Sequence, residues 1–155
     1  MPRSGFVVVT GLLIASAVNA EPSTDVAAAG ATLDDFHKAA AQADEKRYFS
    51  HFAPEGVFLG TDPNERWTVA EFQKFSHPYF ARGKAWTYEP FDRHVVVVGD
   101  FATFDEALRN TKYGLCRGTG ALRRIGGAWK LVQYSLSFPV QNHLAEKVVA
   151  ILKGG

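Results

Sequence analysis

The chain has 155 residues, with 17 basic and 16 acidic side chains and 46% hydrophobic residues. This near-neutral charge excludes the basic face that binding to nucleic acid or to an anionic membrane surface requires. Cys116 is the only cysteine, which excludes an intrachain disulfide, so packing must hold the domain together.

The first twenty residues have the pattern of a secretory signal peptide. Arg3 supplies a positive charge, an apolar run follows over residues 6–15, and small residues lead up to Ala20. The apolar run is shorter than the roughly 20 residues that a membrane-spanning helix needs. We therefore expect cleavage after Ala20, a periplasmic or secreted protein, and no membrane association after cleavage. The remaining chain has balanced charges and is long enough for one domain with a hydrophobic core.

Helices are expected in the first half of the mature chain. Residues 21–31 are small and polar, which predicts a flexible leader. Thr32 is expected to cap a helix whose apolar residues recur at three- and four-residue spacing. A second short helix is expected over residues 44–52. Thr68 and Glu71 then form a capping box that opens a further helix.

The second half of the chain predicts a ladder of β-strands. Alternating and β-branched apolar runs are separated by glycine turns, the clearest of which begin at Gly99 and Gly126. A last amphipathic helix is expected from Asn142. The expected strands cover residues 57–59, 84–91, 93–98, 101–108, 114–125 and 129–138.

These elements predict one α+β domain over residues 32–155. Long strands on a sheet of this size twist and curl, so we expect a strongly curved antiparallel sheet of about five to six strands wrapped around the N-terminal helices. Such a cone encloses a pocket. Residues 95–98 are all valine, so this strand is apolar on both faces. We therefore expect a homodimer in which the convex face of the sheet packs on a second copy.

The order of elements and several short motifs also resemble a known family. Over about residues 32–140 the chain is similar to the nuclear-transport-factor-2-like, or SnoaL-like, superfamily, and within it to an exported bacterial branch close to the association domain of calcium/calmodulin-dependent kinase. This resemblance implies the cone fold. It does not imply one chemistry, because the superfamily includes isomerases, dehydratases, cyclases, transport factors and assembly domains. The motifs that carry it are Gly60-Thr61-Asp62, Glu65-Arg66-Trp67, Phe104-Asp105-Glu106, Cys116-Arg117-Gly118-Thr119-Gly120 and Trp129-Lys130-Leu131-Val132-Gln133-Tyr134.

Two adjacent acidic residues, Asp105 and Glu106, lie in the middle of an expected strand. Neighbouring residues of a strand point to opposite faces, so these two cannot work together as a paired acid and base. Glu106 shares its face with Phe104 and Leu108 and is therefore favoured for the cavity, whereas Asp105 would lie on the convex face.

The role of the inward carboxylate has two interpretations. Burial raises the pKa of a carboxyl group, so it could serve as a general base, with Tyr134 as the matching acid. Alternatively, it forms a structural ion pair with Arg117, Arg93 or Arg66, because a buried charge needs a partner.

Other side chains are candidates for binding a ligand. Arg66 and Trp67 stand near the expected mouth of the pocket, where they either hold a flat anionic ligand or pack the loop on a helix. In the last strand, one face offers Gln133 and Ser135 as hydrogen-bonding groups, and the other face offers Tyr134. Sequence alone leaves both arrangements open. The complete set of pocket candidates is Arg66, Trp67, Trp86, Arg93, Arg117, Gln133 and Ser135.

The function that these features favour is small-molecule binding by an exported binding or accessory protein. The five histidines show no metal-ligand spacing, and the chain contains neither a phosphate-binding loop nor a nucleophile elbow. We therefore expect no metal and no cofactor. Two alternatives stay open, namely a pocket enzyme of the isomerase, dehydratase or cyclase type and an oligomerisation module whose pocket is filled by side chains.

Overall fold

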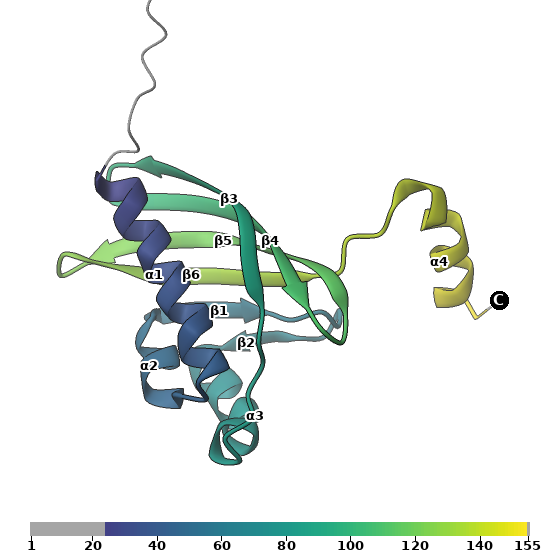
Figure 1. Ribbon diagram of the computed structural model, residues 1–155, viewed down its shortest axis with the longest axis horizontal. Helices are drawn as coiled ribbons and strands as arrows, with labels where there is room; N and C mark the ends of the chain where they lie inside the picture. The colour runs from purple at the N-terminus through teal and green to yellow at the C-terminus, as the bar shows by residue number, and fades with distance from the viewer. Residues whose placement is uncertain (1–23, 155) are drawn as a thin grey trace, which may run out of the picture.

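The computed structural model describes residues 24–154, whose strands form one six-stranded sheet in the order β2-β1-β6-β5-β4-β3. The sheet curves around α1, which crosses its concave side (Figure 1). This arrangement confirms the predicted α+β cone. One pair of neighbours, β1 and β6, is parallel, and the others are antiparallel. The elements are α1 (Thr24–Ala41), α2 (Glu45–Ser50), β1 (Phe52–Leu59), β2 (Arg66–Thr68), α3 (Val69–Ala81), β3 (Glu89–Val98), β4 (Phe101–Asn110), β5 (Gly114–Ile125), β6 (Ala128–Ser137), a 3₁₀ turn (Asn142–Leu144) and α4 (Ala145–Leu152).

The first helix begins earlier than the sequence analysis predicted. Residues 24–31 belong to α1 and not to a flexible leader, because alanine is the strongest helix former and Ala29 is fully buried in the core. Thr32 lies inside the helix, where its hydroxyl donates to the Ala28 carbonyl at 3.1 Å, so it is not a cap. The predicted signal peptide and residues 21–23 of the predicted leader lie outside the described residues.

The predicted capping box at the start of α3 is confirmed. The Thr68 hydroxyl accepts from the Glu71 backbone N–H, and the Glu71 carboxylate accepts from the Thr68 backbone N–H at 2.8 Å. This cap positions α3 beside β1 and β2 at one end of the sheet (Figure 1).

The two strands expected over residues 84–91 and 93–98 are replaced by a loop and a single strand. Residues 84–88 are not a strand, because Trp86 packs against aromatic rings of α2 and α3 and not across the sheet. The single strand β3 then contains a bulge at Asp92, whose φ of 48° lies in the left-handed region. The bulge reverses the side-chain alternation, so the residues after Asp92 point to the opposite face from the one that strict alternation predicts.

A second bulge changes which residues of β6 point inward. Leu122 pairs with Leu131 and Ala121 pairs with Gln133, so Val132 is an extra residue in the strand. The buried set therefore combines Trp129 and Leu131 before the bulge with Tyr134 after it. Strict alternation, on which both sequence-based arrangements depended, places these residues on opposite faces and was wrong here.

The core between the sheet and the helices is strongly aromatic. Phe36 stacks on Tyr48 with ring centroids 4.4 Å apart, and Phe58 stacks on Phe72 at 4.0 Å. Rings from α1, α2, α3 and β1 thus pack together directly, which holds the helices on the concave side of the sheet.

The C-terminal helix α4 stands away from the domain (Figure 1). Ile151 and Leu152 are 64% and 80% exposed, so its apolar stripe has no partner within the described chain. Of the helices within residues 24–154, none is both apolar and long enough to cross a membrane.

Candidate functional site

A cavity of about 350 Å³ lies between the helices and the part of the sheet formed by β1, β2 and β6. Partly exposed rings, including Phe75 and Tyr113, stand at its mouth, whereas His37, Tyr48 and Tyr134 line its buried end. A cavity of this size argues against a pocket filled by side chains. The aromatic residues around the mouth and walls are Phe36, Phe58, Trp67, Phe72, Phe75, Tyr79, Trp86, Tyr88 and Tyr113.

One buried carboxylate, that of Glu106, joins the polar residues at the buried end of the cavity. Glu106 Oε1 lies 2.6 Å from His37 Nε2 and accepts a hydrogen bond from the Tyr134 hydroxyl at 3.0 Å. Glu106 Oε2 accepts from Arg93 Nε at 2.7 Å. We call these four residues the buried cluster. The carboxylate is reached from the cavity through His37 and Tyr134, which form part of the lining.

Strand alternation places Glu106 inside and Asp105 outside. Along β4, Phe104, Glu106 and Leu108 are buried, whereas the Asp105 side chain is 61% exposed on the convex face and lies 3.4 Å from His94. The strand thus delivers a single carboxylate to the interior.

The bulge at Asp92 brings Arg93 to this carboxylate. Phe91 is paired with Ala107, on the convex side, and without an extra residue Arg93 would point to the same side. The bulge instead pairs Arg93 with Glu106. The same guanidinium donates to Asp34 at 2.6 Å and to the Gly30 carbonyl at 3.0 Å, so it ties β3 to α1.

Gly118 provides the space that the buried cluster needs. It is paired with Glu106 across β4 and β5, and a Cβ atom at this position would overlap the Tyr134 hydroxyl and the Glu106 carboxylate. A side chain of any kind at this position would therefore push the cluster apart.

The charges of the buried cluster follow from its contacts. Burial raises the pKa of Glu106, but the hydrogen bond and charge of His37 and the positive charge of Arg93 together reverse this effect and lower that pKa overall. Burial, and then the nearby Glu106 charge, raise the pKa of Tyr134 well above its ordinary value. Glu106 is thus ionised and Tyr134 is neutral at pH 7. An ion-paired carboxylate with a lowered pKa is poorly suited to act as a general base.

His37 is a residue of the buried cluster that the sequence analysis missed. It follows Leu33 by four positions on the buried face of α1, and that spacing was the available signal. Nε2 is the ring nitrogen that pairs with Glu106, so whenever the imidazole is neutral its Nε2–H donates to the carboxylate and the lone pair is on Nδ1. His37 therefore offers the cavity a nitrogen whose tautomer is set by a buried carboxylate.

The structure brings some predicted pocket residues together and separates others. Trp67 and Trp86 line the cavity, and Arg93 lies behind it in the buried cluster. The remaining candidates are outside the site: Arg66 is exposed beside α3, and Arg117, Gln133 and Ser135 lie on the convex face.

Two further groups of residues bear on possible chemistry. Cys116 is buried, and burial raises the pKa of its thiol, which disfavours the reactive thiolate. Among the described residues, no group of three His, Cys, Asp or Glu side chains is placed to hold a metal ion.

Comparison with known proteins identifies the fold. Residues 30–141 match the family model of the SnoaL-like domain, and the curated proteins contain no match. An NTF2-like protein of unknown function from Pseudomonas putida KT2440 is 16% identical, with 78% of this chain and 91% of that chain covered and a TM-score of 0.67. A candidate dehydratase of the NTF2-like family from Streptomyces avermitilis is 22% identical, with 78% and 100% covered and a TM-score of 0.65.

A third solved structure is similar over a shorter part of the chain. It is a candidate ketosteroid isomerase from Shewanella frigidimarina, 19% identical, with 71% of this chain and 94% of that chain covered and a TM-score of 0.59. At these identities the similarity shows a common fold alone. The narrower likeness to the kinase association domain stays an expectation of the sequence.

Proposed function

The chain belongs to the family of SnoaL-like domains, and from this premise we propose that it binds a small, flat, mainly apolar molecule in the cavity. The observation that carries the proposal is the lining, in which large aromatic rings surround a polar end. A volume of about 350 Å³ is within the usual range of ligand pockets, roughly 300–1,000 Å³.

The walls of the cavity favour a planar guest. Trp67 is stacked on Phe72 with nearly parallel rings and continues to Phe75, so one wall is a row of flat faces. Flat apolar molecules bury their surface well against such rings. At the other end, the His37 imidazole can accept a hydrogen bond from the guest.

Calorimetric titration with 2-naphthol tests this function, because the probe is flat and carries one hydroxyl group. We expect saturable one-to-one binding to the wild-type protein. Ala85→Phe places a ring in the cavity and should abolish binding, whereas Ala81→Phe, on an exposed site at the end of α3, should leave it unchanged. Equal binding by the wild type and Ala85→Phe would contradict the proposal.

A second candidate function is proton abstraction from a bound molecule by His37. The observation that favours it is the pair formed by His37 and an ionised Glu106, in which the carboxylate orients the imidazole for general-base catalysis. Two similar structures are described as a candidate dehydratase and a candidate ketosteroid isomerase. Unlike Glu106, His37 combines access to the cavity with a free ring nitrogen.

Exchange of the α-hydrogens of 2-tetralone in D₂O, followed by NMR, tests this second function. His37→Gln should lower any protein-catalysed exchange by about 10²–10⁴-fold. His51→Gln is the matched control, because His51 also pairs with a carboxylate but lies outside the cavity. Equal loss in both variants would point to destabilisation and would contradict a role for His37 in proton transfer.

Export and dimerisation are part of the proposal. In a single chain Val96, Val98 and Phe101 are exposed together on the convex face, which suits a two-fold partner. Native mass spectrometry of the periplasmic protein should give a dimer of chains cleaved after Ala20. An uncleaved chain would contradict export by this signal, and a monomer would contradict the interface.

A further inference from the structure

Lys112 is the only lysine or arginine among the described residues that line the cavity. It stands at the mouth, on the turn between β4 and β5, at the same end of the sheet as the loop between β1 and β2 (Figure 1). Neither the binding of a flat apolar molecule nor proton abstraction by His37 makes use of this positive charge. A cation beside a cavity favours a guest whose outer end is negatively charged.

The turn that carries Lys112 is held in place by Asn110. The Asn110 Oδ1 atom accepts from the backbone N–H groups of Lys112 and Tyr113, each at 2.9 Å. The Asn110 amide in turn donates at 2.9 Å to the carbonyl of Thr87, which belongs to the loop before β3 that also lines the cavity. These bonds fix the backbone of Lys112 relative to the cavity wall.

The ammonium group of Lys112 is not neutralised by a carboxylate. Its Nζ atom lies 4.7 Å from the centroid of the Tyr113 ring, and a hydrogen bond with Tyr113 raises the pKa of Lys112, so this group is charged at pH 7. In the described part of the chain, no Asp or Glu forms an ion pair with it. By contrast, Arg93 and Arg124 each pair with two carboxylates. The charge of Lys112 is therefore available to a ligand.

Glu65 is the acidic residue of the cavity lining within the described chain, and its carboxylate is turned toward its own loop. The Glu65 Oε2 atom accepts from the Asp62 backbone N–H at 3.2 Å, and a Cβ atom on Gly60 would overlap the same oxygen. A second cation lies near the mouth, because the Arg82 guanidinium is 5.1 Å from the centroid of the Tyr79 ring, which lines the cavity. A guest at the mouth therefore meets a surplus of positive charge.

We propose that the Lys112 ammonium binds a carboxylate at the outer end of the ligand, so that the cavity takes flat, mainly apolar carboxylic acids. This inference rests on the proposed function and names the class of ligand for the same cavity. With the carboxylate at the mouth, only the apolar ring enters the interior and no charge loses its hydration. A carboxylate at the inner end would instead approach the ionised Glu106 behind His37 and be repelled, so the charges of the cavity also set the direction of the ligand.

Two compounds that share the skeleton of 2-naphthol test the inference. 6-Hydroxy-2-naphthoate carries a carboxylate at the end opposite the hydroxyl, and 6-hydroxy-2-naphthamide carries a neutral group of similar shape there. In calorimetric titrations at pH 7 and low salt, we expect the wild type to bind the carboxylate about three- to fivefold more tightly, as for a partly exposed ion pair. Lys112→Met should reduce this ratio to about one, and Lys112→Arg should keep it. Lys38→Met, the same change at an exposed site of α1 outside the cavity, is the control and should keep the ratio.

Salt gives a readout that requires no variant. The Debye length falls from roughly 30 Å to roughly 3 Å between about 0.01 M and about 1 M salt, so the ratio should approach one at the higher concentration. A ratio that changes neither with salt nor in Lys112→Met would overturn the inference. If both compounds bind the wild type equally at low salt, the role of Lys112 is wrong and the cavity still binds flat molecules. If neither these compounds nor 2-naphthol bind, the proposed function itself is contradicted.

Discussion

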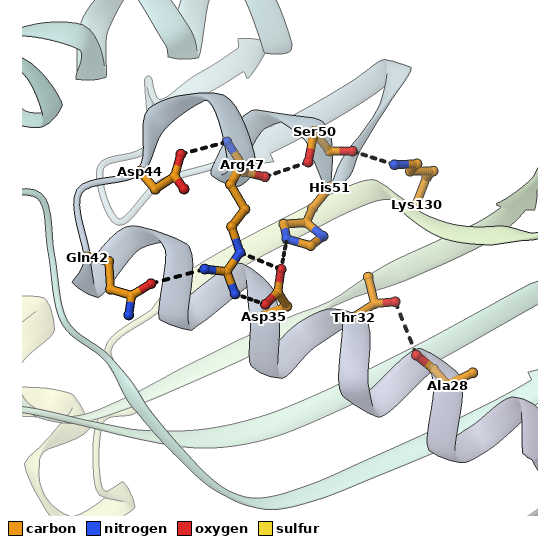
Figure 2. Close-up of polar contacts among 9 residues, drawn as sticks. All are labelled: Ala28, Thr32, Asp35, Gln42, Asp44, Arg47, Ser50, His51 and Lys130. Carbon is orange, nitrogen blue, oxygen red and sulfur yellow. Dashed lines mark hydrogen bonds and ion pairs between the residues drawn. The ribbon is translucent and has the colours of Figure 1, made fainter.

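Two clusters in this protein place a carboxylate between an arginine and a histidine, one inside the domain and one at its surface. The surface cluster joins α1 to α2, where Asp35 accepts from Arg47 Nε at 2.8 Å and lies 2.9 Å from His51 Nε2 (Figure 2). The buried cluster repeats this composition around Glu106. Because both clusters combine a carboxylate, an arginine and a histidine, differences in their pKa values and stability report mainly the effect of burial.

The two clusters differ most in how far the carboxylate is buried. The Asp35 side chain is 38% exposed, whereas that of Glu106 is fully buried. The hydrogen bond from Arg47 is the main cause that lowers the pKa of Asp35 to about 2, and burial, a smaller effect, opposes it. At Glu106, burial is the largest single effect, and its partners must overcome it. Water can replace a lost partner at the surface, but not inside, so only the buried cluster should be sensitive to the loss of one member.

The largest expected effect is that of Glu106→Gln. This change removes the buried one of the two carboxylates that pair with the Arg93 guanidinium and leaves only the more exposed Asp34, and breaking such a buried pair should lower the free energy of unfolding by about 3–5 kcal/mol. Asp35→Asn, the matched change at the surface, should lower it by about 1 kcal/mol or less. Urea unfolding at pH 7 measures both. Similar losses in the two variants would show that burial does not distinguish the clusters.

The second-largest expected difference between the clusters is in the pH dependence of their contributions to stability. A carboxyl group whose pKa is lower in the folded state stabilises above its ordinary pKa and loses this contribution as the pH falls through its folded value. For Glu106 the loss begins near its ordinary value of 4.5, and for Asp35 it runs from 3.8 to about 2. Urea midpoints from pH 7 to pH 3 should therefore fall less steeply below pH 4.5 in Glu106→Gln than in the wild type. Parallel curves would contradict this assignment.

Gly118→Ala should have an intermediate effect. The added methyl group collides with Tyr134 and Glu106, and overpacking of this kind costs about 1–3 kcal/mol. Gly30→Ala is the control, because a Cβ atom at this helical position meets nothing within 4 Å and should be neutral or stabilising. Thermal melts of both variants measure the difference. If Gly118→Ala left the melting temperature unchanged, the buried cluster would have space for the added methyl group, contrary to this prediction.

The sequence was sufficient to predict the fold and the face of the sheet on which Glu106 lies, because both follow from the periodicity of apolar residues. Apolar alternation around Phe104 and Leu108 specified one face of β4, and the capping box specified the start of α3. Both are local patterns that the tertiary structure leaves unchanged at these two places. By contrast, the helical state of residues 24–31 depends on the burial of Ala29 in the core as well as on helix propensity, and the burial is not visible in the local sequence.

The buried cluster could not be assembled from sequence because two bulges decide it. The extra residues Asp92 and Val132 reverse the alternation in β3 and β6, so that Arg93 and Tyr134 point inward together with Glu106. Bulges depend on pairing with a neighbouring strand and leave little trace in a single strand. His37 was missed for a related reason, since its partner is 69 positions away in the chain.

Tyr134→Phe should give the smallest effect that still distinguishes the two clusters. It removes one hydrogen bond to Glu106 but leaves Arg93 and His37 in place, so we expect a loss of about 1 kcal/mol in the free energy of unfolding. Tyr113→Phe is the control, because Tyr113 is 49% exposed and should lose almost nothing. A loss for Tyr134→Phe as large as that for Glu106→Gln would mean that the phenol, and not the ion pair with Arg93, holds the buried carboxylate. The comparison with Asp35, which has no phenol among its partners, would then no longer isolate the effect of burial.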